Sequence, residues 1–441
     1  MLKTLHGARK LISILRACPS IGQLALLACL PCVIVSCVPQ AGKPTADYKT
    51  NDSNSTPQYQ TEKAQPVGEL EHILQTMDIT QKVGQLLIID LYDSHGEAIR
   101  HVNPAMEDWL SVLEPGGVVL YGGNIDTLSQ VRELTSRLQD STRVPLLIAV
   151  DHEGGIVNRF DDSGNISLTE IPAASQIGNV GDPDLTYQIG AIMARELSAL
   201  GINMNFAPVA DIAISAHSVI GSRSYGSDPV GVAQMVASLV LGMQDYGVSA
   251  VIKHFPGHGA AVGDTHSGTV VLNRTREELE SDEFVPFVHG INAGADGIMI
   301  AHLVVPSITT DLTPSTLSWE IMTGILRHAL GFRNIAITDS LTMGSAEEPK
   351  NGDKAVESIL AGSDMLLRPS NPELVKKMLL DAVQKGKLRE SRIDESVRRI
   401  LEVKLLRRPS ADKLITQEAA LEVLNDPSHR KVVDTVRSSR R

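Results

Sequence analysis

A dense group of polar side chains lies between residues 253 and 266, where three histidines, a lysine and an aspartate fall within 14 positions. Lys253 and His254 come first, and Asp264 and His266 follow two residues apart. A carboxylate beside an imidazole orients the ring and favours its charged form, which gives a proton donor that works near neutral pH. We therefore expect Asp264 and His266 to form an acid/base pair on a glycine-rich loop, and Lys253 and His254 to hydrogen-bond a polar ligand.

A zinc site is the alternative for the same segment, because His254 and His258 are four residues apart. Two zinc ligands at this spacing need a helix to bring them to one face. Pro256 and Gly257 lie between the two histidines and disfavour a helix. The segment therefore predicts a polar ligand without a metal, and we expect no organic cofactor.

Two carboxylates directly follow apolar runs that have the character of strands, Asp151 after 146–150 and Asp339 after 334–338. Such an acid points into the mouth of a parallel sheet, where it can bind a hydroxyl or act as a nucleophile. It can equally cap the next turn or helix. Arg223 lies among small residues before a helix signal and is either a ligand contact or an exposed loop residue.

The elements that must position these residues are short apolar runs that alternate with longer segments of helical period. Continuous apolar strands bury both faces, as parallel strands covered by helices do. Asp182-Pro183 and Asp228-Pro229 are helix starts, and Thr275 to Glu278 is a capping box. The eight predicted strands are Gln85–Asp90, Gly117–Tyr121, Leu146–Val150, Asn203–Phe206, Ser249–Ile252, Gly297–Ala301, Asn334–Thr338 and Met365–Leu367.

Eight strand and helix units over a span of about 340 residues suit an enlarged (β/α)8 barrel of the TIM type better than an open doubly wound sheet. We expect this single catalytic α/β domain to cover residues 68–408, followed by a helical or frayed tail at 409–441. In such a barrel the chemistry gathers at the carboxyl ends of the strands.

Residues 1–37 have the layout of a bacterial lipoprotein signal peptide. Four basic residues and no acidic one precede an apolar run at 24–35 that is too short to span a bilayer comfortably. The run ends in Ser36-Cys37, which resembles a lipobox, so Cys37 is the expected site of lipidation. Residues 38–67 are polar and Pro-, Ser- and Thr-rich, and predict a disordered linker. An uncleaved N-terminal membrane anchor is the alternative.

The composition predicts a globular body that does not bind nucleic acid. The chain is 42% hydrophobic and carries a formal net charge of −12, which disfavours a polyanion as partner. All 4 cysteines lie within residues 1–37, so the mature body would have no disulfide and no cysteine-ligated metal. We expect a monomer that is lipid-anchored to a bacterial membrane and works outside the cytoplasm.

Five ordered motifs resemble glycoside hydrolase family three, in its bacterial β-N-acetylglucosaminidase branch. The resemblance covers residues 70 to 405, most of the chain. The motifs are Asp-x-Glu-Gly-Gly-x-Val-x-Arg at 151–159, Asn-Phe-Ala-Pro-Val-x-Asp at 205–211, Gly-x-Arg-Ser-Tyr-Gly at 221–226, Lys-His-Phe-Pro-Gly-His-Gly at 253–259 with Asp-x-His at 264–266, and Thr-Asp-Ser-Leu-x-Met at 338–343.

The resemblance implies a retaining, exo-acting β-N-acetylhexosaminidase, because the Asp-x-His loop distinguishes this branch from the β-glucosidases of the family. By the same resemblance Asp339 is the nucleophile and His266 the general acid/base, with Asp264 as its partner. The residues that would hold the hydroxyls of the terminal sugar are Asp151, Arg159, Arg223, Lys253 and His254.

Two positions depart from the family pattern, His152 where many relatives have glutamine and Ser340 where some have a second acid. Neither carries a proposed catalytic role, and both are candidates for tuning substrate preference. The expected substrate is a cell-wall fragment, as in peptidoglycan recycling, or a chitin-like oligosaccharide that contains N-acetylglucosamine. A β-N-acetylglucosaminide phosphorylase and a non-catalytic sugar-binding lipoprotein are the alternative functions.

Overall fold

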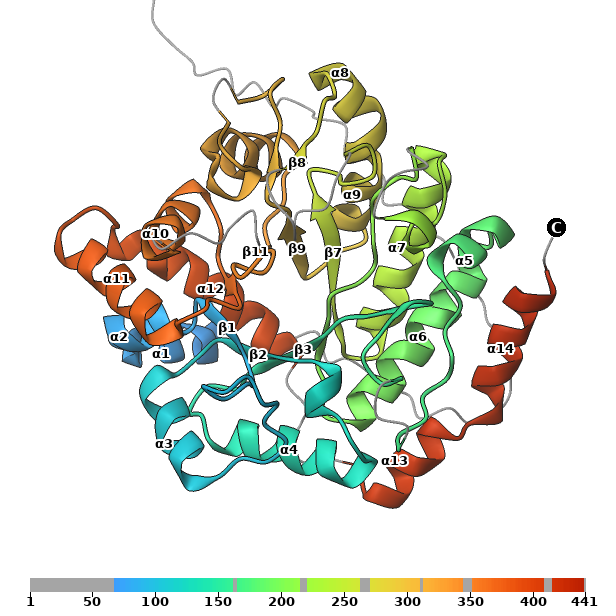
Figure 1. Cartoon of the computed structure of the whole chain (residues 1–441), viewed down its shortest axis with the longest axis horizontal. Coiled ribbons are helices and arrows are strands. Elements are labelled where there is room, and N and C mark those ends of the chain that lie inside the picture. Colours follow the sequence, from blue (N-terminus) through green and yellow to red (C-terminus); the bar gives the residue numbers. More distant parts are fainter. Residues whose placement is uncertain are drawn as a thin grey trace, which may run out of the picture. The chain divides into compact units, whose positions relative to one another are not determined.

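Figure 1 shows a computed structural model of the chain, which describes seven stretches of the sequence. The expected signal peptide, Cys37 and the linker up to residue 66 lie outside these stretches, and so do Asp264 and His266. The described residues are 67–161, 165–214, 220–261, 270–309, 312–343, 351–407 and 415–439.

Eight parallel strands form the central sheet. They are β1 (Leu87–Asp90), β2 (Gly117–Leu120), β3 (Leu147–Val150), β6 (Met204–Asn205), β7 (Ser249–Phe255), β9 (Gly297–Ile300), β11 (Ile335–Thr338) and β12 (Leu366–Leu367).

The strands follow the spatial order β11-β9-β7-β6-β3-β2-β1-β12. The two edges of this sheet meet, because an isolated parallel bridge joins Ile337 of β11 to Met365 just before β12. The nearly closed sheet is consistent with the predicted TIM-type barrel, and each predicted apolar run contains or overlaps one strand.

Strand residues alternate between the interior of the barrel and the helices around it. Ile88, Val119 and Leu147 belong to an interior cluster, whereas their neighbours Leu87 and Val118 pack in the layer shared with the helices. This alternation is that of a barrel whose interior is filled with side chains. Both faces are buried, which is why the sequence shows continuous apolar runs rather than alternation.

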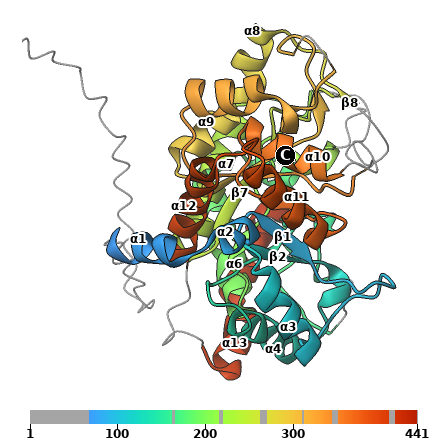
Figure 2. The same ribbon diagram turned by 90° about the vertical axis from the view of Figure 1, so that its left-hand side faces the viewer.

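Helices cover the outside of the barrel (Figures 1 and 2), and the predicted helix starts are confirmed. Asp182 and Asp228 each cap a helix through its first backbone N–H groups, and Thr275 forms a capping box with Glu278. The α-helices are α1 (Val67–Thr76), α2 (Ile79–Gly84), α3 (Pro104–Leu113), α4 (Leu128–Asp140), α5 (Ala174–Val180), α6 (Pro183–Ala199), α7 (Pro229–Asp245), α8 (Arg276–Glu278), α9 (Phe284–Asn292), α10 (Asn351–Ala361), α11 (Pro372–Gln384), α12 (Glu390–Leu406), α13 (Gln417–Leu424) and α14 (Pro427–Ser438).

Smaller elements line the connections. The short strands are β4 (His152–Gly154) and β5 (Val157–Asn158), which pair with each other, and β8 (Val270–Val271) and β10 (Leu303–Val304), which form a second pair. The 3-10 and π turns are η1 (Gly122–Asn124), η2 (Gly221–Arg223), η3 (Leu279–Glu283), η4 (Ser315–Leu317) and η5 (Glu320–Ala329).

One predicted boundary is wrong at the fifth strand, which we expected to end at Ile252. β7 continues to Phe255, so Lys253 and His254 lie on the strand and not in the loop after it. The extension includes a register shift between Ile252 and Phe255. Phe255 stabilises it by stacking on Phe284, with ring centroids 5.6 Å apart. This aromatic contact is tertiary, so strand propensity alone could not place the end.

The last helix of the barrel domain, α12, closes the amino ends of the strands. Its Ile400 and Val403 join the interior cluster of the barrel. Lys404 is buried there and donates from Nζ to Oε1 of Gln85 at 2.6 Å. Burial alone lowers the pKa of Lys404 from 10.5 to about 7.

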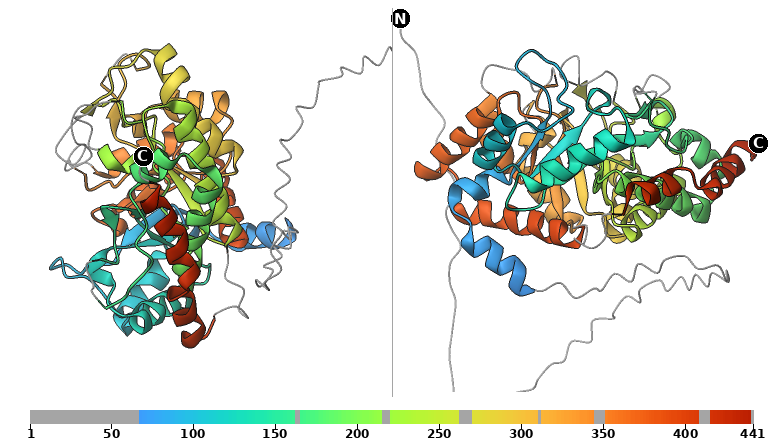
Figure 3. Two further views of the ribbon diagram at one scale, coloured as in Figure 1. Left: turned by 90° about the vertical axis from the view of Figure 1, so that its right-hand side faces the viewer. Right: turned by 90° about the horizontal axis from the view of Figure 1, so that it is seen from below.

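The C-terminal segment, expected to be helical or frayed, is helical over its described residues, and α14 packs against α5 and α6 (Figure 3). His429 of α14 is buried, and its Nδ1 lies 2.9 Å from Oε1 of Glu196 on α6. This contact spans 233 positions, so the tail had no local signal for its docking. Among the described residues, we find no helix with the length and apolar character to cross a membrane.

Candidate active site

Polar side chains collect at the carboxyl ends of the barrel strands. Asp90 ends β1, Tyr121 follows β2 and Asp151 follows β3. Asp339 follows β11, and Arg368 follows β12. The carboxyl ends of parallel strands open on the same end of a barrel, so these residues line one mouth although they are far apart in the sequence.

A buried ion network occupies the base of this mouth. Lys253 places Nζ 2.7 Å from Oδ1 of Asp151 and 2.6 Å from Oε1 of Glu153. Arg223 donates to both oxygens of Glu153 at 2.8 Å, and Arg159 donates to Oδ2 of Asp151 at 3.2 Å. Each buried charge thus has an opposite charge in contact, as a stable buried network requires.

The network keeps its carboxylates ionised. Burial by itself raises the pKa of Asp151, but the neighbouring Lys253 and Arg159 outweigh it and lower the pKa to about 2. The pKa of Glu153 is lowered in the same way, against its burial, chiefly by Lys253 and Arg223. The site therefore offers both strong acceptors and strong donors to the hydroxyl groups of a polar ligand.

His254 is held by a second carboxylate, that of Asp211. The Nδ1 atom of His254 lies 2.7 Å from Oδ2 of Asp211, which also accepts from the backbone N–H of His254. The backbone N–H of His258 donates to Oδ1 at 2.6 Å. On the other side of the ring, Nε2 lies 3.5 Å from a terminal nitrogen of Arg223. Asp211 thereby fixes the ring orientation, and the contact with Arg223 joins His254 to the ion network.

Asp339 stands apart from the ion network, at the end of β11. The backbone N–H of Ser340 donates to its Oδ1 at 2.7 Å, and the carboxylate is half-buried. Buried His302 supports this loop, with Nε2 3.2 Å from the carbonyl oxygen of Ser340 and Nδ1 2.9 Å from the hydroxyl of Thr316. Since a carbonyl only accepts, Nε2 carries the proton, and burial, which lowers the pKa of His302, favours the neutral ring that accepts at Nδ1.

The negative charge of Asp339 acts on the pKa of two histidines of the site. Burial lowers the pKa of both His258 and His302, and the negative charge of Asp339 partly offsets this in each case. His258 also donates its backbone N–H to Asp211, the carboxylate that holds His254. Asp339 and the ion network thus lie at the same end of the barrel.

The structure brings together the five residues predicted to bind a ligand, Asp151, Arg159, Arg223, Lys253 and His254, through the contacts given above. Asp339 lies at the same end of the barrel. The positions of the predicted acid/base pair fall outside the described residues.

Sequence reasoning missed three residues of the site, Glu153, Asp211 and His302. A usable signal existed for Glu153, because Asp151 and Glu153 are two positions apart and side chains at that spacing share one face of an extended chain. Asp211 ends the Asn-Phe-Ala-Pro-Val-x-Asp motif at 205–211 and so had a sequence signal, whereas His302 follows β9 with no local pattern that sets it apart. The partners of both come from other segments, so only the folded chain shows what each residue holds.

The two departures from the family pattern occupy supporting positions. His152 is fully buried against Phe160, with ring centroids 5.5 Å apart, and burial lowers its pKa to about 4. The side chain of Ser340 pairs with Thr342 at 2.9 Å. Neither side chain belongs to the ion network described above.

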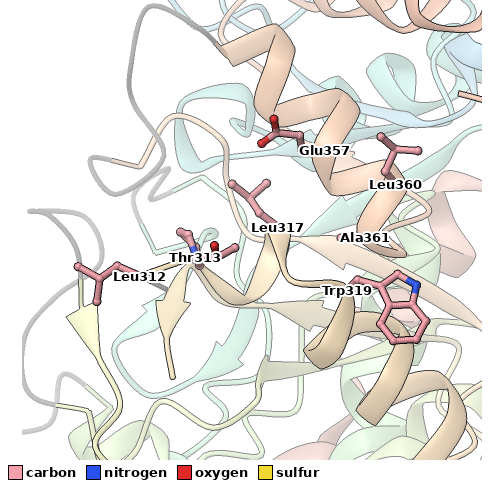
Figure 4. A pocket seen from close by; sticks show the side chains of 8 residues that line it. Leu312, Thr313, Leu317, Trp319, Glu357, Leu360 and Ala361 are labelled. Carbon is pink, nitrogen blue, oxygen red and sulfur yellow. The ribbon is translucent and has the colours of Figure 1, made fainter. Parts of the chain in front are cut away.

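A surface cavity of about 580 Å³ lies elsewhere, between η4, the start of η5 and α10 (Figure 4). Its lining is mainly apolar and includes Leu312, Leu317, Trp319 and Leu360, with Glu357 as the charged residue. It shares no residue with the ion network. A polar ligand needs donors and acceptors, so the strand ends with their ion network are the better candidate for an active site.

The fold and the strand-end site define an enzyme class that the family comparison identifies. Residues 78–403 match the glycosyl hydrolase family 3 N-terminal domain, which is most of the chain. The chain therefore belongs to glycosyl hydrolase family 3 and is a glycosidase.

Relatives and solved structures agree with this assignment. A beta-hexosaminidase of Nitrosomonas eutropha is 38% identical over 271 residues, which cover 60% of this chain and 76% of that protein. A family 3 beta-N-acetylglucosaminidase of Paenibacillus has a TM-score of 0.73 at 33% identity, over 82% of this chain and 68% of that one. A beta-glucoside phosphorylase, BglX, has a TM-score of 0.73 at 27% identity, over 84% of this chain and 65% of its own.

Proposed function

We propose that this protein is a retaining, exo-acting β-N-acetylhexosaminidase that removes terminal N-acetylglucosamine from cell-wall or chitin-like oligosaccharides. The observation that carries the proposal is that the Asp339 carboxylate and a buried network of paired charges lie at the same end of the barrel. The names of the relatives, beta-hexosaminidase and beta-N-acetylglucosaminidase, support the sugar class.

The ion network binds the non-reducing sugar in this proposal. Asp151 and Glu153 accept hydrogen bonds from sugar hydroxyls, Lys253 and Arg223 donate to hydroxyl oxygens, and Nε2 of His254 bonds a further hydroxyl. A charged partner makes each such bond stronger than a neutral one. Because these groups are mostly buried, the end of a chain fits and its middle does not, which gives exo action.

Asp339 acts on the anomeric carbon. Departure of the glycosidic oxygen builds positive charge there, and a carboxylate beneath it stabilises the transition state. The same carboxylate then captures the sugar as a covalent glycosyl-enzyme, and attack by water in the second step retains the configuration. The bond from the backbone N–H of Ser340 fixes the orientation of the carboxylate for this attack.

His266 is the proposed general acid/base, with Asp264 as its partner, although both lie outside the described residues. An imidazole can give a proton to the leaving oxygen and then take one from water, because its pKa lies near neutral pH. Such proton transfer contributes typically about 10²–10⁴ in rate.

The first test is release of phenol from aryl β-glycosides of N-acetylglucosamine, N-acetylgalactosamine and glucose. We expect hydrolysis of the N-acetylglucosaminide, and Asp339→Ala should abolish it with an unchanged melting temperature. Asp140→Ala, at the exposed end of α4, is the control and should keep full activity. An active Asp339→Ala enzyme would refute the nucleophile. No turnover by the wild type would favour a non-catalytic sugar-binding protein.

The second test concerns His266. An activated aryl leaving group departs with little proton donation, whereas a disaccharide needs it. The loss of activity caused by His266→Ala should therefore be at least tenfold smaller on aryl substrates than on N-acetylglucosamine disaccharides. Equal losses on both substrate classes would remove the acid/base assignment.

A phosphorylase is the second candidate, and the likeness to a beta-glucoside phosphorylase favours testing it. A neutral imidazole base does not repel phosphate as a carboxylate base does. Chromatography of the product with and without inorganic phosphate separates the two functions. Free N-acetylglucosamine in both assays supports the hydrolase, while a sugar 1-phosphate in the presence of phosphate supports the phosphorylase.

We also propose that Cys37 carries a lipid that anchors the protein outside the cytoplasm of a bacterium. The support is the basic, apolar and small-residue sequence that precedes this cysteine. The test is metabolic labelling with an alkyne fatty acid, which should mark the wild type and not Cys37→Ala. Label on the variant would place the lipid elsewhere.

A further inference from the structure

An ion pair at the rim of the mouth has no part in the function proposed above. Arg368 follows β12 and donates from Nε to Oδ2 of Asp90, at the end of β1, at 2.6 Å. Its guanidinium carbon also lies 5.1 Å from the centre of the Tyr121 ring and 5.9 Å from that of Tyr92. In the turn after β5, the guanidinium of Arg159 lies 5.5 Å from the same Tyr121 ring.

Exposure separates this rim from the base of the mouth. The side chains of Arg368, Arg159 and Asp90 are 35%, 34% and 24% exposed. Those of Lys253 and Glu153 are 3% and 4% exposed. In an enzyme that holds the terminal sugar at the base, the rim faces the leaving group, or aglycone, that is attached to that sugar. We call Asp90, Arg368, Tyr121 and Arg159 the rim group, although Arg159 also reaches the ion network through Asp151.

The strand order places Arg368 next to the proposed nucleophile. β12 adjoins β11 at the closure of the barrel, and the backbone N–H of Leu341 donates to the carbonyl of Leu367 at 2.9 Å. Leu341 is two residues after Asp339, and Leu367 directly precedes Arg368. The bond therefore holds the two segments side by side. The anomeric carbon must lie over Asp339, so the leaving group begins beside the end of β12.

The backbone of Arg368 is held in an unusual conformation, with φ at 50°. A left-handed conformation is unfavourable for a residue that is not glycine, and such residues cluster at ligand-binding sites. The bond from its N–H to the carbonyl of Ile88, at 2.7 Å, and the pair with Asp90 hold it there. The conformation fixes the guanidinium against Tyr121 at the edge of the mouth.

We propose that Arg368, supported by Tyr121, forms a leaving-group subsite that favours an aglycone bearing a carboxylate. The inference rests on the proposed glycosidase function. Asp90 engages Nε of Arg368, so the terminal nitrogens of the fork can meet a second carboxylate. Arg159 is paired with Asp151, so the donors that an anionic aglycone meets at this rim are the terminal nitrogens of Arg368.

The test uses two aryl β-N-acetylglucosaminides whose phenyl rings carry a carboxylate or a carboxamide at the same position. The measured quantity is the ratio of kcat/KM for the carboxylate over that for the carboxamide. Differences in leaving-group ability cancel when the ratio is compared between enzymes. One lost charge-assisted hydrogen bond predicts that Arg368→Met lowers the ratio about tenfold. Arg368→Lys should keep part of it, and Asp90→Asn should raise it.

Arg195→Met is the matched control, because Arg195 also lies over a tyrosine, 4.3 Å from the ring centre of Tyr246, but on α6. It should leave the ratio unchanged. An Arg368→Met enzyme with the wild-type ratio, or a wild type whose ratio does not fall with added salt, would overturn the subsite while leaving the glycosidase intact. Failure of the wild type to cleave either substrate would instead refute the proposed function and the subsite together.

Discussion

Glu153 gives the sharpest test of the site, because sequence reasoning missed it and the structure places it at the centre. Its Oε1 accepts from Lys253 at 2.6 Å and its two oxygens accept from Arg223 at 2.8 Å. The replacement Glu153→Gln keeps the shape of the side chain. It removes one negative charge and turns an N–H₂ donor toward cations that can only donate.

The expected magnitude follows from burial. Removing one partner of a buried ion pair costs about 3–5 kcal/mol, because the other charge stays buried without compensation. This loss should lower the melting temperature by on the order of 5–10 °C. Lys253 and Arg223 should lose their fixed positions, and we expect the KM of an aryl N-acetylglucosaminide to rise at least tenfold. Differential scanning fluorimetry and steady-state kinetics measure the two effects.

Glu170→Gln is the matched control. Glu170 pairs with Arg437 at the same 2.8 Å, but its side chain is 80% exposed whereas that of Glu153 is 4% exposed. An exposed ion pair contributes about 0–1 kcal/mol to stability. This variant should therefore have the melting temperature and the KM of the wild type. Similar small effects in both variants would refute the reasoning that burial, and not distance, sets the strength of the network.

Three further predictions concern other parts of the fold. With its pKa lowered to about 7 from 10.5, folded Lys404 binds fewer protons than the unfolded chain between these values, so stability rises with pH across that window. Lys404→Met should flatten that rise in urea unfolding, and an unchanged slope would contradict the burial of the charge. In Gly178→Ala, the new Cβ would lie 1.6 Å from the carbonyl oxygen of Tyr225, so the variant should melt well below Gly68→Ala, which meets nothing within 4 Å. Equal melting temperatures would count against that close approach. His302→Phe loses both hydrogen bonds beside the proposed nucleophile and should lower kcat more than it raises KM. The reverse pattern would assign His302 to substrate binding.

Much of the fold could be predicted from the sequence, because the signals for its strands and helix starts are local. A strand buried on both faces is a continuous apolar run, and all eight runs contain or overlap strands of the central sheet. Helix starts at Asp182 and Asp228 were legible because a cap bonds to N–H groups two or three residues away. The end of β7 and the docking of α14 were not, since Phe284 and Glu196 stabilise them from distant positions.

The sequence by itself determined which chemical groups stand at the carboxyl ends of the strands, including Asp151, Lys253 and Asp339. Only the tertiary structure decided their partners, because barrel closure brings residues together that the chain separates. Lys253 meets Asp151 across 102 positions, and Arg368 meets Asp90 across 278. Whether a charge is buried and paired, or exposed at the rim, depends on those distant neighbours and sets its strength.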